Sequence, residues 1–282
     1  MISIPVAVHT SLFQWQLDLF WHAHKSIYGA NAYKKAFAII IKRNNLRHPK
    51  QEELAWDIDI PHAMCESFFD MYPDETNADG LYVPLNIQTG LQQIIHSFPD
   101  EQVIEVLDCD MLHLRRHPDI MVRDDELVVD DIYEPWHLKS LSSNRHVIDI
   151  YFENGGRFYN GGFVPIIGKV KTFKKLLPEW IAVHRHILRR NLPSSIKWWG
   201  GMFGLQAACE KKKVRMRAES YCYIPSINRL EDHHYIAHYS CDKKFDKKIY
   251  PRVDSSTFED NLFYRTILGW PTFSRNHAGS QY

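Results

Sequence analysis

The sequence predicts an α/β fold with a mainly parallel central sheet flanked by helices. Short apolar runs that suit buried strands alternate with longer segments whose apolar residues recur at helical spacing. The chain has 282 residues, 45% of them hydrophobic, so it is long enough to bury a sizeable core. No repeat, low-complexity tract or glycine/serine linker divides it. We therefore expect one domain over residues 1–282, with residues 250–282 as a peripheral C-terminal tail.

In the first half of the chain, strands are expected at Pro5–His9, Phe37–Ile41 and Val103–Leu107, and helices at Leu12–Tyr28 and Leu91–Phe98. Gly29 suits the end of the first helix, because glycine adopts the left-handed conformation common at helix C-termini. Pro99 stops the second helix. The strand Val103–Leu107 is apolar except for Glu105.

The second half begins with a charged region, Arg115–Arg145, which we expect to be irregular and in which Asp124-Asp125 and Asp130-Asp131 are expected to be solvated. After it, strands are expected at Val147–Phe152 and Val164–Ile167, and helices at Leu176–Leu188 and in the glycine-rich segment Trp198–Cys209.

Charge and cysteine content exclude several classes of protein. Lys+Arg and Asp+Glu both number 34, so the basic surface typical of a nucleic-acid-binding protein is not expected. Five scattered cysteines form no CxxC pair, which favours a reducing compartment. The longest aliphatic run, Ala36–Ile41, is too short to span a bilayer. The N-terminus has no basic segment of a signal peptide. We expect a soluble, cytoplasmic protein.

The most informative motif is Asp108-Cys109-Asp110, directly after the strand Val103–Leu107. Ligands of α/β proteins bind at the carboxyl ends of the strands, and two carboxylates there suit Mg²⁺ or Mn²⁺. Such an ion stabilises the negative charge of a departing diphosphate. A solvent-facing turn with two acids is the structural alternative.

Two further motifs follow the acidic pair. Asn160-Gly161-Gly162 lets a ligand approach the backbone, although as an isolated motif it is more typical of a hairpin turn. His238 could complete a metal shell, and Lys243 or Lys244 could neutralise a phosphate. Taken alone, a single histidine among 16 is more often structural.

The order of these motifs resembles metal-dependent glycosyltransferases of the GT-A fold, in particular hydroxyproline arabinosyltransferases and peptidyl-serine galactosyltransferases. To a lesser degree the chain resembles small glycosyltransferases of algal viruses. The segments that carry the resemblance are His9–Gln16, Tyr82–Asn86, Leu107–Met111, Trp198–Phe203 and His238-Tyr239. They touch most of the chain from residue 5 to about 245.

The resemblance implies a role for each matching position. Asp110 and His238 would bind the metal ion, and Asp108 would contact the ion or the donor ribose. His9, Thr10 and Asn86 would lie near the nucleoside, Lys243 or Lys244 near the diphosphate, and Asn160, Gly161 and Gly162 near the donor sugar.

One position departs from the family pattern. Many relatives carry an acid immediately before the methionine of the Trp198–Phe203 segment, where it can act as the catalytic base, but here Gly201 stands there. Any base must reach the acceptor hydroxyl, and the open candidates are Asp79, Asp149, Glu153 and Asp232.

The expected function is therefore the transfer of a monosaccharide from a UDP-sugar to a glycan or protein hydroxyl. UDP-xylose is the first donor to test, and inversion of configuration is favoured over retention. Two alternatives stay open. One is a nucleotidyltransferase that uses the same carboxylate pair, and the other is a non-catalytic module that binds nucleotides or carbohydrates.

Overall fold

The structure of the protein is a computed structural model. It describes residues 1–9, 11–42, 58–72, 83–130, 163–189, 200–224 and 229–238. The expected strand Val147–Phe152 and the expected tail, residues 250–282, lie outside these ranges.

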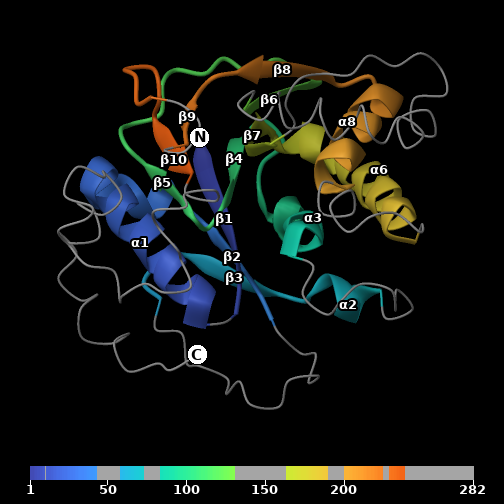
Figure 1. The fold of residues 1–282 in the computed structure, drawn as a ribbon, viewed down its shortest axis with the longest axis horizontal. Coiled ribbons are helices and arrows are strands. Elements are labelled where there is room, and N and C mark those ends of the chain that lie inside the picture. Colours follow the sequence, from blue (N-terminus) through green and yellow to red (C-terminus); the bar gives the residue numbers. More distant parts are fainter. Residues whose placement is uncertain are drawn as a thin grey trace.

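A seven-stranded sheet forms the centre of the molecule, in the order β3-β2-β1-β4-β7-β6-β8 (Figure 1). Its strands are β1 Ile2–Val8, β2 Ala38–Ile41, β3 His62–Cys65, β4 Val103–Asp108, β6 Glu126–Asp130, β7 Phe163–Lys169 and β8 Arg215–Glu219. The strands β3, β2, β1 and β4 run parallel, as do β6 and β8, while β7 runs antiparallel to both of its neighbours. The α/β prediction with a mainly parallel sheet is confirmed.

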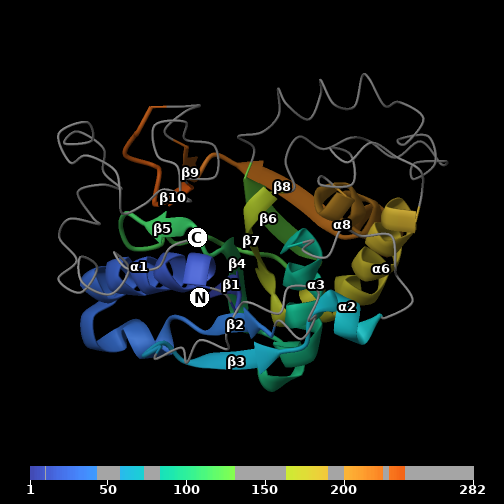
Figure 2. The same ribbon diagram turned by 60° about the horizontal axis from the view of Figure 1, so that its bottom comes forward.

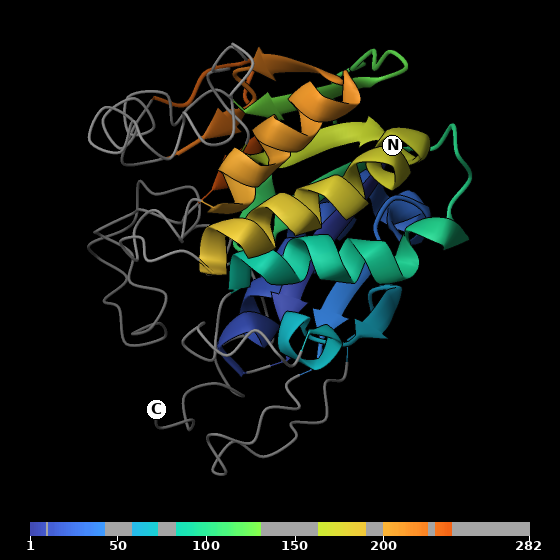
Figure 3. The same ribbon diagram turned by 90° about the vertical axis from the view of Figure 1, so that its right-hand side faces the viewer.

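Helices cover both faces of the sheet. On one face lie α3 (Val83–Ile94), α6 (Val170–Arg189) and α8 (Gly200–Lys212), side by side in Figure 3. On the other face lies α1 (Ser11–Tyr28), beside a small second sheet (Figures 1 and 2). No helix in the described ranges is long and apolar enough to cross a membrane.

The small sheet has the order β5-β10-β9, with β5 Met111–His113, β9 Cys222–Tyr223 and β10 Ile236–His238. The short elements that complete the described chain are the helical turns η1 (Gly29–Lys34), α2 (Phe68–Met71) and η2 (Ile95–Ser97). Because β5 follows β4 after a two-residue turn, the small sheet begins at the carboxyl end of the central sheet.

Most expected elements lie close to their observed positions, but the helix expected at Leu91–Phe98 and the region Arg115–Arg145 differ clearly from the prediction. The helix expected at Leu91–Phe98 begins eight residues earlier, at Val83, and its last turn is the 3₁₀ turn Ile95–Ser97. Gly29 ends α1 with a positive φ of 57°, as expected.

The prediction of irregular structure over Arg115–Arg145 is wrong for β6, which lies buried between β7 and β8. The charged residues at the two ends of β6 made it look irregular in the sequence, but both Glu126 and Asp130 are buried and have partners. Glu126 forms ion pairs with Arg215 and Arg217. Asp130 is 1% exposed and accepts a hydrogen bond from the backbone N–H of Cys222, so the expectation that it is solvated is also wrong.

Helix α3 packs closely on β2 through Gly90. A Cβ atom at this position would lie 2.6 Å from Cγ2 of Ile39 and 3.0 Å from Cδ1 of Ile41. Both isoleucines are fully buried, so they have little room to move. The glycine therefore sets how closely the helix approaches the sheet.

We expect Gly90→Ala to lower the free energy of unfolding by about 1–3 kcal/mol, because overpacking outweighs the gain in helix propensity of about 1 kcal/mol. Urea unfolding of the variant and the wild type measures the difference. Gly204→Ala in α8 is the control, since its nearest contact would be 3.3 Å, to Cδ1 of Trp180, and its cost should be smaller. A more stable Gly90→Ala variant would contradict this account of the packing.

His184 joins the three helices on this face. It lies in α6, its Nδ1 is 3.0 Å from Nε2 of Gln88 in α3, and its ring lies against Gly200 at the start of α8. The side chain is fully buried, and desolvation lowers the pKa of His184 to about 3.

This lowered pKa predicts a loss of stability in acid. Below about pH 6.5 the unfolded chain takes up a proton on this residue while the folded chain does not, so the free energy of unfolding falls between about pH 6.5 and pH 3. His184→Gln should make this decline shallower by up to about 1.4 kcal/mol per pH unit. Urea unfolding at several pH values tests this, with the exposed His186→Gln on the same helix as control. Identical slopes for His184→Gln and the wild type would refute it.

Candidate metal centre

Two carboxylates lie where β4 leaves the central sheet. Asp108 is the last residue of β4 and pairs with Val6 of the neighbouring parallel strand β1. Asp110 follows in the turn to β5, and its side chain is 9% exposed, against 36% for Asp108. The pair therefore lies at the carboxyl edge of the parallel strands, with Asp108 the more open to solvent.

His238 reaches the two carboxylates from the far end of the sequence. It is the last residue of β10 and pairs with Met111 of β5, directly after Asp110. Its Nε2 lies 3.3 Å from Oδ1 of Asp110 and 3.8 Å from Oδ2 of Asp108. The imidazole is only 2% exposed. Antiparallel pairing of the short strands β10 and β5 fixes the position of this residue.

The three side chains form a donor set that a single cation can share. One ligand atom from each lies within 4.8 Å of the others. With metal–ligand bonds of about 2.1 Å, adjacent ligands of an octahedral ion are about 3.0 Å apart and opposite ligands about 4.2 Å apart. The observed separations of 3.3 and 3.8 Å fall between these values. Two carboxylates and one imidazole suit Mg²⁺ or Mn²⁺.

Cys109, between the two acids, points into the protein. Its thiol lies 3.2 Å from Oε1 of Gln16 on α1, which ties this turn to the helix. The nearby Cys222 on β9 is buried, and burial together with the charges of Asp130 and Asp110 raises the pKa of its thiol. Neither thiol is suited to be a nucleophile.

Gln16 and Asp130 also support the site, although the sequence assigned neither a role there: Gln16 lies in the segment His9–Gln16 that carries the resemblance, and Asp130 was expected to be solvated. Gln16 contacts the turn between the two acids, and Asp130 anchors the backbone of β9, which pairs with β10. Each is a polar residue whose partner lies more than 90 positions away. Only the fold brings these pairs together.

The other predicted binding residues in the described ranges lie at different distances from this edge. His9 follows β1, and its backbone N–H donates to the carbonyl of Ile41, so it lies at the carboxyl end of the sheet as expected. Asn86 is buried in α3, and its side-chain carbonyl accepts from the N–H of Phe68. Its amide oxygen is thus used to connect α3 to α2.

Asp232, one of the candidate bases, has a fully exposed side chain in the turn before β10. The remaining predicted residues lie outside the described ranges, so their roles stay predictions: Thr10, Asp79, Asp149, Glu153, Asn160, Gly161, Gly162, Lys243 and Lys244.

Gly201, at the position where the glycosyltransferases that the sequence resembles have an acid, is enclosed by helices. A Cβ atom there would lie 3.3 Å from both Nε2 of Gln88 and Cε1 of His184. The carbonyl of Gly201 accepts a hydrogen bond of 2.6 Å from the indole of Trp180. Even a Cβ atom at this position would need its neighbours to move by a few tenths of an ångström, so the glycine suits the close packing of α8 on α6 and α3.

Known proteins add no further constraint on the function. Neither a protein-family model nor a curated protein matches the sequence. The geometry of the centre is thus the basis for assigning a function.

Proposed function

We propose that this protein is a glycosyltransferase that uses Mn²⁺ or Mg²⁺ to transfer a monosaccharide from a UDP-sugar to an acceptor hydroxyl. The observation that carries the proposal is the convergence of Asp108, Asp110 and His238 at the carboxyl edge of the sheet. These residues were selected from the sequence as ligands of one ion, although 128 positions separate Asp110 from His238.

Each residue has a distinct role in this proposal. Asp110 and His238 are buried and bind the ion from the protein side. Asp108 is more exposed and faces the donor, either through the ion or through the ribose. The ion, when bound, stabilises the negative charge that develops on the departing diphosphate. His9, at the end of the adjacent strand, lies toward the nucleoside.

The acceptor side is less defined. Asp232 is the candidate base within the described ranges, and its segment leads directly into β10 and His238. UDP-xylose is the first donor that we would test, and inversion is the favoured outcome by resemblance.

A non-catalytic binding module is the second candidate, and one observation favours it. Gly201 has no side chain that could act as the base found at this position in similar enzymes, and its surroundings are closely packed. Such a module would use the same three ligands to bind a nucleoside diphosphate with its cation, without turnover.

We expect slow, metal-dependent hydrolysis of one UDP-sugar, a reaction in which water takes the place of the acceptor hydroxyl. A screen of nucleotide sugars, with free nucleoside diphosphate as readout, should show release with Mn²⁺ and none with EDTA. Asp110→Ala should reduce this release by at least about a hundredfold, because stabilisation of the leaving group is worth several kcal/mol.

Asp124→Asn is the matched control, because it also removes one negative charge but from an exposed ion pair with Lys169 and Lys171. It should leave hydrolysis unchanged. If Asp110→Ala hydrolyses the donor as fast as the wild type, the assignment of the centre is wrong.

Binding of UDP separates the two candidates from an unrelated function. Calorimetry should show that UDP binds in the presence of Mn²⁺ and that Asp110→Ala and His238→Ala weaken this binding at least tenfold, since each removes one ligand. Binding without turnover on a broad panel of acceptors would favour the module. A folded wild-type protein that binds no UDP with either Mn²⁺ or Mg²⁺ would exclude both candidates.

A further inference from the structure

Glu105 places a carboxylate inside the protein, away from the candidate metal centre. The side chain is fully buried on β4. Its Oε2 lies 3.0 Å from Nε2 of His113 and 2.7 Å from Nε2 of His117, and it accepts a hydrogen bond of 2.8 Å from Ser3. Its Oε1 accepts a hydrogen bond of 2.6 Å from the hydroxyl of Tyr235. Two imidazoles therefore converge on one carboxylate oxygen.

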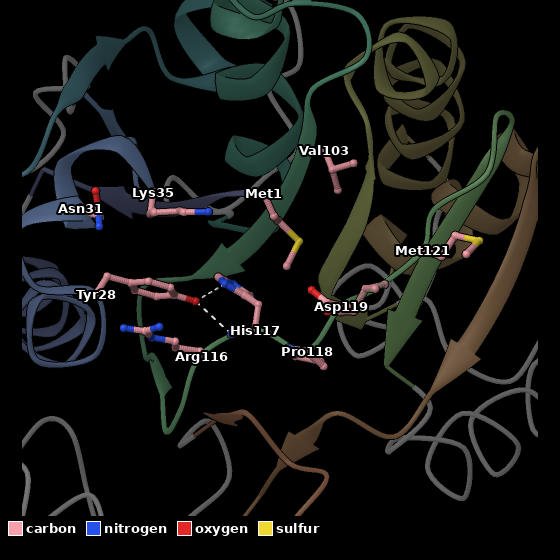
Figure 4. Close-up of a pocket in the computed structure, with 11 residues that line it drawn as sticks. Met1, Tyr28, Asn31, Lys35, Val103, Arg116, His117, Pro118, Asp119 and Met121 are labelled. Atoms are coloured by element: carbon pink, nitrogen blue, oxygen red, sulfur yellow. Dashed lines mark hydrogen bonds between the residues drawn. The ribbon is translucent and has the colours of Figure 1, made fainter.

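The outer nitrogens of both imidazoles are also held. Nδ1 of His113 lies 3.1 Å from Nδ1 of His24, and Nδ1 of His117 contacts the hydroxyl of Tyr28 (Figure 4). Histidines that bind metal ions commonly use their second nitrogen in this way, because the outer hydrogen bond fixes the ring and its tautomer. The cluster has both an inner donor set and an outer shell.

The charge of Glu105 needs compensation. Its two oxygens meet the hydroxyls of Ser3 and Tyr235 and the two imidazoles, a set of partners that suits an ionised carboxylate. Among the residues that the structure describes, its ion pairs are with these two histidines. A buried anion requires either a protonated imidazole or a metal ion beside it.

His113 and His24 are both buried, and their Nδ1 atoms face each other at 3.1 Å. The two Nδ1 atoms share one hydrogen. When His113 carries it, its Nε2 turns a lone pair toward the carboxylate, and a cation between the two atoms makes the contact favourable. When His24 carries it, His113 donates to Glu105 directly and no cation is needed.

The distances lie near those between the ligands of a cation. Ligands of an ion with bonds of about 2.1 Å are about 3.0 Å apart at octahedral angles and about 3.4 Å apart at the tetrahedral angles that zinc prefers. The nitrogen–oxygen separations of 3.0 and 2.7 Å would therefore have to open by about 0.4 and 0.7 Å around zinc. All three ligand atoms lie within 4.8 Å of one another. His117 and Tyr28 also line a pocket of about 550 Å³ at the amino end of β4, so one side of the cluster borders this pocket.

We propose that Glu105, His113 and His117 form a second metal site, which binds a divalent transition-metal ion such as Zn²⁺. Imidazole nitrogens favour such ions over Mg²⁺, whereas the centre at Asp108 and Asp110 is richer in oxygen. The ion would be structural, since the donor set is buried and joins α1, β1, β4 and β5. Zinc binding at this site does not require the proposed transferase activity.

Zinc retention tests the proposal on the full chain. Protein stripped with a chelator is given stoichiometric Zn²⁺, desalted and analysed for metal by mass spectrometry. We expect about one zinc ion per chain in the wild type and in Asp110→Ala, and a loss of retention in His117→Gln, with at least tenfold weaker binding in competition with a chromogenic chelator. Glutamine keeps a hydrogen-bonding group at position 117. The fold of the His117→Gln variant is checked by circular dichroism.

A second measurement does not depend on any variant. Nitrogen NMR of the imidazoles in the wild type should show Nε2 of His113 and His117 shifting when Zn²⁺ is added, with both Nδ1 atoms protonated. Nε2 atoms that stay protonated in the presence of Zn²⁺ would overturn the proposal. It is also overturned if folded wild-type protein retains no zinc, or if Asp110→Ala loses the ion while His117→Gln keeps it.

Discussion

The arrangement around the candidate metal centre depends on the contacts of one buried carboxylate, that of Glu105. It contacts Ser3 of β1, His113 of β5, His117 beyond it and Tyr235 just before β10. These residues come from both sheets and from distant parts of the chain. A buried polar group left without a partner costs about 1–3 kcal/mol, and more when it is charged. The fold therefore keeps all four contacts together, and with them the segments to which they belong.

The same segments carry the ligands of the centre. Asp108 follows Glu105 by three residues, Asp110 precedes His113 by three, and His238 follows Tyr235 by three. In a strand, three residues span about 10 Å, so the buried network lies one short step behind the site. A shift of β5 or β10 that moved His238 away from Asp110 would also disturb the contacts of Glu105. The register of the small sheet is thus held by hydrogen bonds and ion pairs as well as by its backbone ladder.

The sequence predicted what is encoded locally. The apolar run of β4 and the acids after it predicted both the strand and the place of the carboxylates, because strand periodicity and the edge of a parallel sheet follow from short-range pattern. Sequence geometry alone could not identify His238 among 16 histidines, and only the order of motifs in a known family selected it. Strand β6 was missed because Glu126 and Asp130 are charged, and the partners of these two buried acids, Arg217 and the N–H of Cys222, are about 90 positions away.

Glu105 shows the same limit more sharply. In the sequence it is one polar residue within an apolar strand, which suggests an exposed position on one face of the sheet. In the fold it is fully buried, and its two histidine partners come after the acidic motif in the sequence. The strand therefore presents two different donor sets, one with imidazoles in the interior and one rich in carboxylate at its open end. The inner set, with two imidazoles, suits a transition-metal ion, whereas the outer set leaves Asp108 open to solvent, so that diphosphate oxygens could complete the shell of a hard cation there.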